Sequence, residues 1–221
     1  MNKKRILVIG ANGFTGRRIL DDLTTQERYD VIGCSLHNDM APESGHYRFI
    51  RADICNRNDL EFLFETAIPD VVINASALSV PDYCENHRNK AEEVNSLAVE
   101  NLARHCEALG SRFIHLSTDF VFSGDSSKLY TEEDSPEPVN YYGVTKLKGE
   151  RCIAAYCTNY AVVRVAVVYG SALPGQHGNI LQLVADRLRN GEEIQVVSDQ
   201  WRTPSFVGDV SAGINKLIFP T

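Results

Sequence analysis

The stretch Arg5-Ile6-Leu7-Val8-Ile9-Gly10-Ala11-Asn12-Gly13-Phe14-Thr15-Gly16 decides the fold of this chain. Its apolar, β-branched beginning, residues 5–9, is typical of a strand that is buried on both faces. Residues 17–23, which follow the stretch, carry apolar side chains at helical spacing. A strand that runs through a glycine loop into a helix is typical of the first unit of a parallel α/β sheet.

The three glycines of this loop have distinct expected tasks. Gly10 permits a tight turn, Gly13 lets the backbone approach a pyrophosphate, and Gly16 allows the helix to pack closely on the strand. The N-terminus of the helix would favour the bound anion. The spacing Gly-x-x-Gly-x-x-Gly differs from the dinucleotide fingerprint Gly-x-Gly-x-x-Gly, so the glycines could also serve the turn alone. Their place between a strand and a helix favours nucleotide binding.

Strands and helices alternate along residues 4–170. The apolar runs predict further strands over residues 30–34, 47–51, 70–74, 112–116 and 160–168. Helical spacing predicts helices over residues 58–67 and 89–109, and a third that carries Tyr142 and Lys146. The helix over 89–109 is expected to bury one stripe and to end at Gly110; the stripe consists of Val94, Ala98, Leu102 and Cys106. This alternation predicts an α/β fold, a Rossmann-type doubly wound parallel sheet covered on both faces.

The pattern loosens after Gly170. It predicts a helix over residues 178–190, a strand over 193–197 and a helix over 207–217, with a polar loop at 199–204. We therefore expect two parts: residues 1–170 as a dinucleotide-binding Rossmann domain, and residues 171–221 as a smaller lobe. The last helix of that lobe is expected to pack back on the Rossmann domain.

Composition excludes several classes of protein. The chain has 221 residues, 43% of them hydrophobic, and a net charge of -7. No basic cluster beyond Lys3-Lys4-Arg5 offers a footprint for nucleic acid. No apolar run approaches the ~20 residues that span a bilayer or resembles a signal peptide, so a cytoplasmic location is expected. The six scattered cysteines are expected to be reduced thiols; Cys84 and His87 have a metal-like spacing without a second ligand pair, so no metal is expected.

Tyr142 and Lys146 are the candidates for chemistry. Side chains four residues apart lie on one face of a helix. An ammonium near a phenol favours the phenolate, so we expect Lys146 to lower the pKa of Tyr142 from about 10. Tyr142 could then transfer a proton to or from a substrate oxygen near neutral pH. The alternative is an aromatic residue packed on a helix beside a solvated lysine.

Small and hydroxylated residues follow two of the predicted strands. Ala75-Ser76-Ala77 leave room for a ligand at the carboxyl end of one strand, or else allow tight packing. Ser117-Thr118-Asp119 at the end of another could hydrogen-bond a carbonyl oxygen, or could simply begin a turn. The second strand lacks the acidic residue expected for NAD, and Arg17 with His37 could meet the 2′-phosphate of NADP.

These motifs together resemble the extended branch of the short-chain dehydrogenase/reductase family, in particular dTDP-4-dehydrorhamnose reductases and related nucleotide-sugar reductases. The resemblance covers essentially the whole chain. The stretches that carry it are Gly10 to Gly16, Asp53-Ile54, Asn74-Ala75-Ser76-Ala77, Val94-Asn95, Ser117-Thr118-Asp119-Phe120-Val121-Phe122, Tyr142-Gly143-Val144-Thr145-Lys146 with Gly149-Glu150, and Arg202-Thr203-Pro204.

The resemblance implies NADP(H) or NAD(H) as cofactor and a nucleotide sugar as substrate. It implies that Thr118 polarises the substrate carbonyl, that Tyr142 donates a proton, and that Lys146 holds the nicotinamide ribose. The implied cofactor-binding residues, besides Tyr142 and Lys146, are Gly10, Asn12, Gly13, Phe14, Thr15, Gly16, Asp53, Ile54, Ala75, Ser76 and Ala77. Besides Thr118, the candidate substrate-binding residues are Asn179 and Arg202, whose guanidinium suits a diphosphate.

The resemblance leaves alternatives open. An epimerase or dehydratase acting on a sugar nucleotide would use the same scaffold, although a dehydratase would need a second acid beside Asp119, where Phe120 stands. The chain also resembles the regulatory subunit of methionine adenosyltransferase, a binding protein without turnover. The family further implies a homodimer through the helices at 89–109 and 142–157. Its members continue past the point where this chain stops and so complete the substrate lobe. The resemblance thus implies that the lobe at residues 171–221 is substrate-binding and incomplete; the expectation is either a shortened protein or a fragment.

Overall fold

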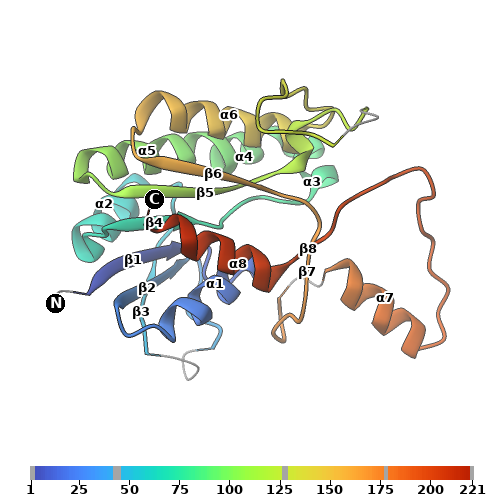
Figure 1. Cartoon of the computed structure of the whole chain (residues 1–221), viewed down its shortest axis with the longest axis horizontal. Helices are drawn as coiled ribbons and strands as arrows, with labels where there is room; N and C mark the ends of the chain where they lie inside the picture. The colour runs from blue at the N-terminus through green and yellow to red at the C-terminus, as the bar shows by residue number, and fades with distance from the viewer. Residues whose placement is uncertain (1–2, 42–45, 126–128, 177–178, 220–221) are drawn as a thin grey trace.

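The computed structural model describes residues 3–41, 46–125, 129–176 and 179–219. Its centre is a six-stranded sheet in the order β3-β2-β1-β4-β5-β6, with every neighbouring pair parallel (Figure 1). The strands are β1 (Lys4–Ile9), β2 (Tyr29–Ser35), β3 (Arg48–Arg51), β4 (Val71–Asn74), β5 (Arg112–Thr118) and β6 (Tyr160–Val165). The chain moves outward from β1 in one direction and then, from β4, in the other. This confirms the Rossmann-type doubly wound sheet.

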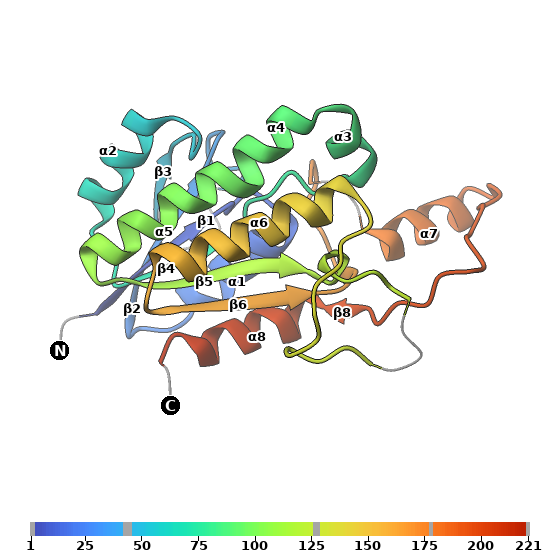
Figure 2. The ribbon, with the colours of Figure 1, turned by 90° about the horizontal axis from the view of Figure 1, so that it is seen from above.

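Helices cover both faces of the sheet. α2 (Arg57–Ala67), α5 (Ala98–Leu109) and α6 (Tyr141–Tyr156) lie over one face, and α1 (Phe14–Thr24) and α8 (Val207–Leu217) over the other (Figure 2). Along β1, Ile6 and Val8 belong to the core on the α1 side, whereas Leu7 and Ile9 belong to the core beneath α5. This alternation follows from the two-residue period of a strand, and it explains why β1 reads as a continuous apolar run.

The predicted helix over residues 89–109 contains a π turn. The chain forms α4 (Arg88–Glu92), the π turn η2 (Glu93–Leu97) and then α5. Asn95 and Ser96 of the π turn are both buried, while Val94 is only half-buried and leaves the predicted stripe. Gly110 ends the helix with φ +68, which confirms its predicted role as a left-handed cap.

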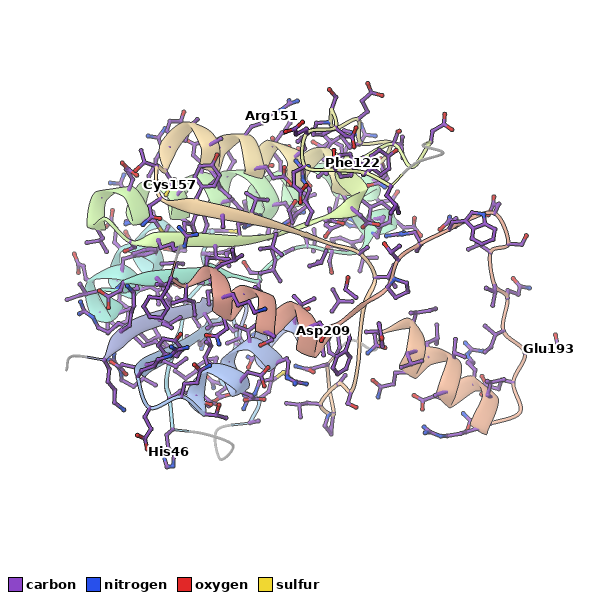
Figure 3. All side chains as sticks on the ribbon, viewed as in Figure 1. His46, Phe122, Arg151, Cys157, Glu193 and Asp209 are labelled. Atoms are coloured by element: carbon purple, nitrogen blue, oxygen red, sulfur yellow. The ribbon has the colours of Figure 1, made fainter. Side chains whose placement is uncertain are left out.

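Two predicted strands differ in the structure. β6 ends at Val165 rather than 168, because Val167 adopts φ +38 and turns the chain; β7 (Val168–Tyr169) then pairs with β8 (Ser205–Phe206) in a separate small sheet. The strand predicted over 193–197 is wrong, because that segment has no ladder partner and forms an irregular loop. Figure 3 shows Glu193 in this loop, well away from the sheet.

The two helices that the structure describes after Gly170 pack differently against the rest of the molecule. α7 (Ile180–Arg189) has no buried residue and projects from the body of the molecule (Figure 1). By contrast, Ile214 of α8 and Ile218 just after it are buried in the same core as Ile19 and Leu20 of α1, as predicted for the last helix. A short helix that sequence analysis did not predict, α3 (Pro81–Asn86), precedes α4. Within the described ranges, no helix is both long and apolar enough to cross a bilayer.

Candidate functional site

The glycine loop and the ends of β4 and β5 meet at one edge of the sheet, because all six strands run in parallel. Gly10 has φ +80, and a Cβ there would lie 2.7 Å from the Ser76 backbone nitrogen. A Cβ on Gly16 would lie 2.1 Å from the Gly10 carbonyl oxygen. Neither distance is compatible with a larger residue. The loop therefore packs directly on the end of β4, and Gly10 and Gly16 allow the tight turn and the close helix packing that the sequence predicts.

The N-terminus of α1 is suited to a pyrophosphate. Gly13 is the residue before the first turn, and no side chain in the described part of the molecule caps this helix. Phe14, Thr15 and Gly16 supply the backbone N–H groups of that turn, which lack an intrahelical acceptor. Such a bare N-terminus, preceded by glycines at positions 10 and 13, fits a dinucleotide phosphate. The structure thus brings the predicted loop residues together in a form that can hold the predicted cofactor.

Asn12 fixes the shape of the loop. Its side-chain amide donates to the Asn38 carbonyl at 2.9 Å, and its Oδ1 accepts from the Met40 N–H at 3.1 Å. The Asn12 carbonyl accepts from Gln176 Nε2 at 3.0 Å, which connects the loop to the segment after β7. Asn12 therefore acts on the site by holding three chain segments in place.

Arg17 does not reach an open position for a 2′-phosphate. It is buried, and its guanidinium is paired with Asp21 at 2.9 Å and with Asp39 at 3.0 Å. His37 meets the glycine loop through its backbone carbonyl, which accepts from Asn12 at 3.4 Å. The predicted preference for NADP over NAD thus gains no support from these two residues.

The remaining predicted cofactor residues lie at the same edge. Asp53 and Ile54 follow β3; Oδ1 of Asp53 accepts from the Cys55 N–H at 2.9 Å, and Ile54 is buried in the core under α2. Ala75 and Ser76 follow β4 and are half-buried, and Ala77 is exposed. The small side chains after β4 leave the edge accessible beside the glycine loop, as expected for the crevice of this fold.

Tyr142 and Thr118 are brought together at the start of α6. Tyr142 is 8% exposed, its hydroxyl hydrogen-bonds the Thr118 side chain, and its ring stands edge-on to Phe120 at 5.9 Å. Asn140 begins the helix by accepting from the Gly143 N–H at 2.8 Å. Thr118 also accepts from the Phe120 N–H, which fixes its side chain at the end of β5. Both hydroxyl groups therefore lie at the end of β5, at the same edge of the sheet as the glycine loop.

The predicted effect of Lys146 on Tyr142 is wrong for this state of the protein. Burial raises the pKa of Tyr142 to about 12, although the hydrogen bond with Thr118 opposes the rise. Lys146 is itself buried, and its Nζ lies 2.7 Å from the Leu116 carbonyl oxygen and 3.0 Å from His115 Nε2. Burial lowers the pKa of Lys146 to about 7, against the opposing influence of Glu150. The amine is thus directed to the strand beneath it, and Tyr142 stays protonated near neutral pH.

Glu150 anchors the same helix one turn later. Its carboxylate accepts from Arg164 at 2.6 Å and from the Ser117 hydroxyl. The pair is largely buried, at 8% exposure for Glu150 and 25% for Arg164. A buried carboxylate held by a guanidinium and a hydroxyl fixes the position of α6 on β5 and β6, and with it the positions of Tyr142 and Lys146.

The two candidate substrate-binding residues, Arg202 and Asn179, occupy different places in the structure. Arg202 pairs with Asp119 at 2.6 Å and lies 4.5 Å from the centre of the Phe120 ring, so it reaches the end of β5 beside Thr118. Asn179 instead caps α7 by accepting from the Gln182 N–H, and it donates to the Gly170 carbonyl at 2.7 Å. The structure brings Arg202 to the site and uses Asn179 to hold the chain.

Two residues with evident roles were not selected from the sequence. Asn95 bonds both the N–H and the carbonyl of Leu78 and also Thr145, so it joins the loop after β4 to α6. His115 is wholly buried between Asn74 and Lys146. The motif Val94-Asn95 contains a signal for the first, whereas His115 occupies an ordinary strand position. Cys84 and His87 make separate contacts, and the described residues contain no metal-ligating group of three or more His, Cys, Asp or Glu.

Comparison with known proteins agrees with this geometry. The family model of the RmlD substrate binding domain matches residues 4–220. The chain is 32% identical over 209 residues to methionine adenosyltransferase 2 subunit beta of Danio rerio, covering 94% of the chain and 61% of the relative. It is 32% identical over 217 residues to dTDP-4-dehydrorhamnose reductase of Mycolicibacterium smegmatis, covering 97% and 60%. The chain thus spans about three fifths of the length of these relatives.

A solved structure shares the fold. It is the crystal structure of dTDP-4-dehydrorhamnose reductase from Bacillus anthracis in complex with NADP, which superposes with a TM-score of 0.87 at 29% identity, covering 98% of this chain and 70% of the other. The family model and the shared fold extend over nearly all of the chain, the glycine loop and the Tyr142–Lys146 pair included. The chain belongs to the RmlD substrate binding domain family.

Proposed function

We propose that this protein reduces a 4-keto nucleotide sugar with NAD(P)H, of the type dTDP-4-dehydrorhamnose to dTDP-rhamnose. The observation that carries the proposal is the placement of Thr118 and the buried Tyr142 and Lys146 at the sheet edge beside the glycine loop. A proton donor, a hydroxyl that can orient a carbonyl, and a dinucleotide cradle are the parts that carbonyl reduction needs. A reductase relative of the family supports the choice of reaction.

The protein residues have separate tasks in this reaction. A nicotinamide held at this edge would supply the hydride for the carbonyl carbon of the substrate. Thr118 orients the carbonyl oxygen, and Tyr142 gives its hydroxyl proton to that oxygen. In the cofactor-free protein, burial raises the pKa of Tyr142 to about 12, so Tyr142 keeps this proton throughout the neutral range. Lys146 holds the nicotinamide ribose, and the N–H groups at the start of α1 hold the pyrophosphate.

Arg202 is the proposed contact for the diphosphate of the substrate. Its guanidinium lies next to Thr118 through its ion pair with Asp119, and it remains 27% exposed. A planar guanidinium matches phosphate oxygens in pairs. The same ion pair disfavours a dehydratase, because Asp119 is engaged by Arg202 at 2.6 Å and is not a free acid.

A binding subunit without turnover is the second candidate. It is favoured by the identity with methionine adenosyltransferase 2 subunit beta, which equals the identity with the reductase relative. The complete set of Thr118, Tyr142 and Lys146 favours the enzyme, because a protein that only binds needs no buried proton donor. The two functions are distinguished by turnover in the presence of bound cofactor.

The first test follows the absorbance of NADPH in the presence and absence of dTDP-4-dehydro-β-L-rhamnose. Oxidation that depends on this substrate, and not on UDP-glucose as control, is the expected result. Calorimetry of NADPH binding accompanies the assay. Tight binding without oxidation would support the binding subunit, and absence of both binding and oxidation would overturn both candidates.

The homodimer through α5 and α6 stays a prediction. Leu109 of α5 and Tyr156 of α6 are exposed apolar side chains, and so is Leu97 of the π turn just before α5. Sedimentation velocity over a range of protein concentrations would give the mass of the assembly and test it.

A further inference from the structure

A row of buried polar groups crosses from β4 to α6 beneath the site. Asn74 Nδ2 lies 3.1 Å from His115 Nδ1, and His115 Nε2 lies 3.0 Å from Lys146 Nζ. Asn74, His115 and Lys146 are all within 1% of complete burial. Asn74 and His115 are register partners on neighbouring strands, so the row is built into the sheet. Buried polar groups of this kind each need a hydrogen-bond partner.

The direction of each hydrogen bond in the row follows from one backbone group. The Ser76 N–H lies 3.0 Å from Asn74 Oδ1, and an N–H can only donate, so this atom of Asn74 is the amide oxygen. The amide nitrogen of Asn74 therefore faces His115 and donates to Nδ1. A neutral imidazole that accepts at Nδ1 carries its proton on Nε2.

That proton points at Lys146. An ammonium group has three donors and no acceptor, so it would meet the Nε2–H of His115 donor against donor. An uncharged amine has one lone pair and accepts this hydrogen bond. One of its two N–H groups then donates to the Leu116 carbonyl at 2.7 Å. Only in this arrangement does each hydrogen bond of the row join a donor to an acceptor.

We propose that Asn74 and His115 are positioning residues that hold Lys146 as an uncharged amine in the cofactor-free protein. The charged groups around Lys146 agree with this. Glu150, one turn further along α6, favours the ammonium, but its carboxylate is engaged by Arg164 and Ser117. From β5, His115 is a titratable group in contact with Lys146, and burial lowers its own pKa well below the usual range.

A consequence, which rests on the proposed reductase function, concerns Tyr142. An uncharged Lys146 does not draw the phenol towards ionisation, and burial raises the pKa of Tyr142 to about 12. Asn74 and His115 thus preserve Tyr142 as a proton donor before the cofactor binds. The remaining N–H of Lys146 is left for the nicotinamide ribose.

The test is side-chain NMR of the cofactor-free protein. Nitrogen-15 shifts of the histidine rings report which nitrogen carries the proton, and the His115 signals are those lost in His115→Gln. We expect the Nε2–H form at every pH from about 8 to about 9, above the pKa of Lys146 of about 7. An Nδ1–H form, or a ring that gains a second proton in this range, overturns the proposal. This readout needs no turnover, so it can fail while the reductase function stands.

A second variant tests the link to Lys146. Asn74→Asp can accept from both Ser76 and His115, which moves the ring proton to Nδ1 and leaves Nε2 as an acceptor for an ammonium. In protein labelled with carbon-13 at the lysine ε carbon, Lys146 should titrate near pH 7 in the parent chain and at least about one unit higher in this variant. There are two controls. The exposed Lys148 gives a reference lysine signal in the same labelled protein. The variant His105→Gln removes a half-buried ring elsewhere and should leave the titration of Lys146 unchanged. An unchanged titration in Asn74→Asp overturns the proposal.

Discussion

Replacement of Tyr142 with Phe should lower substrate-dependent NADPH oxidation by about a thousandfold, the usual contribution of a positioned general acid. The variant loses only the hydroxyl. The ring keeps its buried position and its edge-on contact with Phe120. Thr118 keeps its bonds to Asp119 and to the Phe120 N–H, so the end of β5 stays in place. NADPH affinity should therefore change little, and the loss should appear in kcat rather than in KM.

Tyr141→Phe provides the matched control. Tyr141 is the neighbouring residue on α6, and its hydroxyl donates to Glu92 at 3.2 Å, away from Thr118. This variant should retain oxidation within a few fold of the parent chain. Equal losses in both variants would contradict a proton-donor role for Tyr142 and would indicate damage to α6 instead.

Replacement of Lys146 with Met should remove a pH dependence from folding stability. In the folded chain the pKa of Lys146 is about 7, and in the unfolded chain it is near 10.5. At pH values between these two pKa values, the unfolded chain binds a proton that the folded chain does not. The free energy of unfolding of the parent chain therefore increases as the pH rises. Relative to Lys146→Met, this gain should amount to about 2 to 3 kcal/mol between about pH 6.5 and about pH 9.

Urea unfolding of both proteins at the two pH values measures this difference, because the other titrating groups are common to both chains. Lys148→Met serves as the control. Lys148 is half-exposed and pairs with Glu92, so its removal should leave the pH dependence nearly unchanged. A parent chain whose stability does not rise relative to Lys146→Met would show that the buried amine remains charged.

The central fold was predictable because its signals are local. The apolar runs at β1, β4 and β5 and the helical spacing at α1 and α2 lie within single elements, and the structure follows them closely. The strand predicted over 193–197 failed because alternating apolar residues form a strand only beside a sheet edge, and none is near. The early end of β6 follows from Val167 at φ +38, a conformation that no local pattern announces for a β-branched residue.

The candidate site was predictable only in part. The spacing of Tyr142 and Lys146 places both on one helix face, and the resemblance supplied Thr118 as their neighbour. The state of Lys146 depends on groups from β4 and β5, namely Asn74, His115 and the Leu116 carbonyl. These partners are distant in sequence. The burial that they create changes the pKa of Lys146 more than its spacing from Tyr142 does. The sign of the pKa shift of Tyr142 could therefore not be read from the helix alone.

The exposure of α7 has a consequence for how the molecule opens. Backbone amides exchange with solvent by local opening where few side chains are buried, and by global unfolding in a packed core. α7 contributes no buried residue, whereas β1 lies between two cores. Deuterium should therefore enter residues 180–189 orders of magnitude sooner than residues 6–9. The sheet and its glycine loop would stay folded while this helix unfolds and refolds. The same chain therefore combines a stable central sheet with a helix that opens locally many times before the protein unfolds.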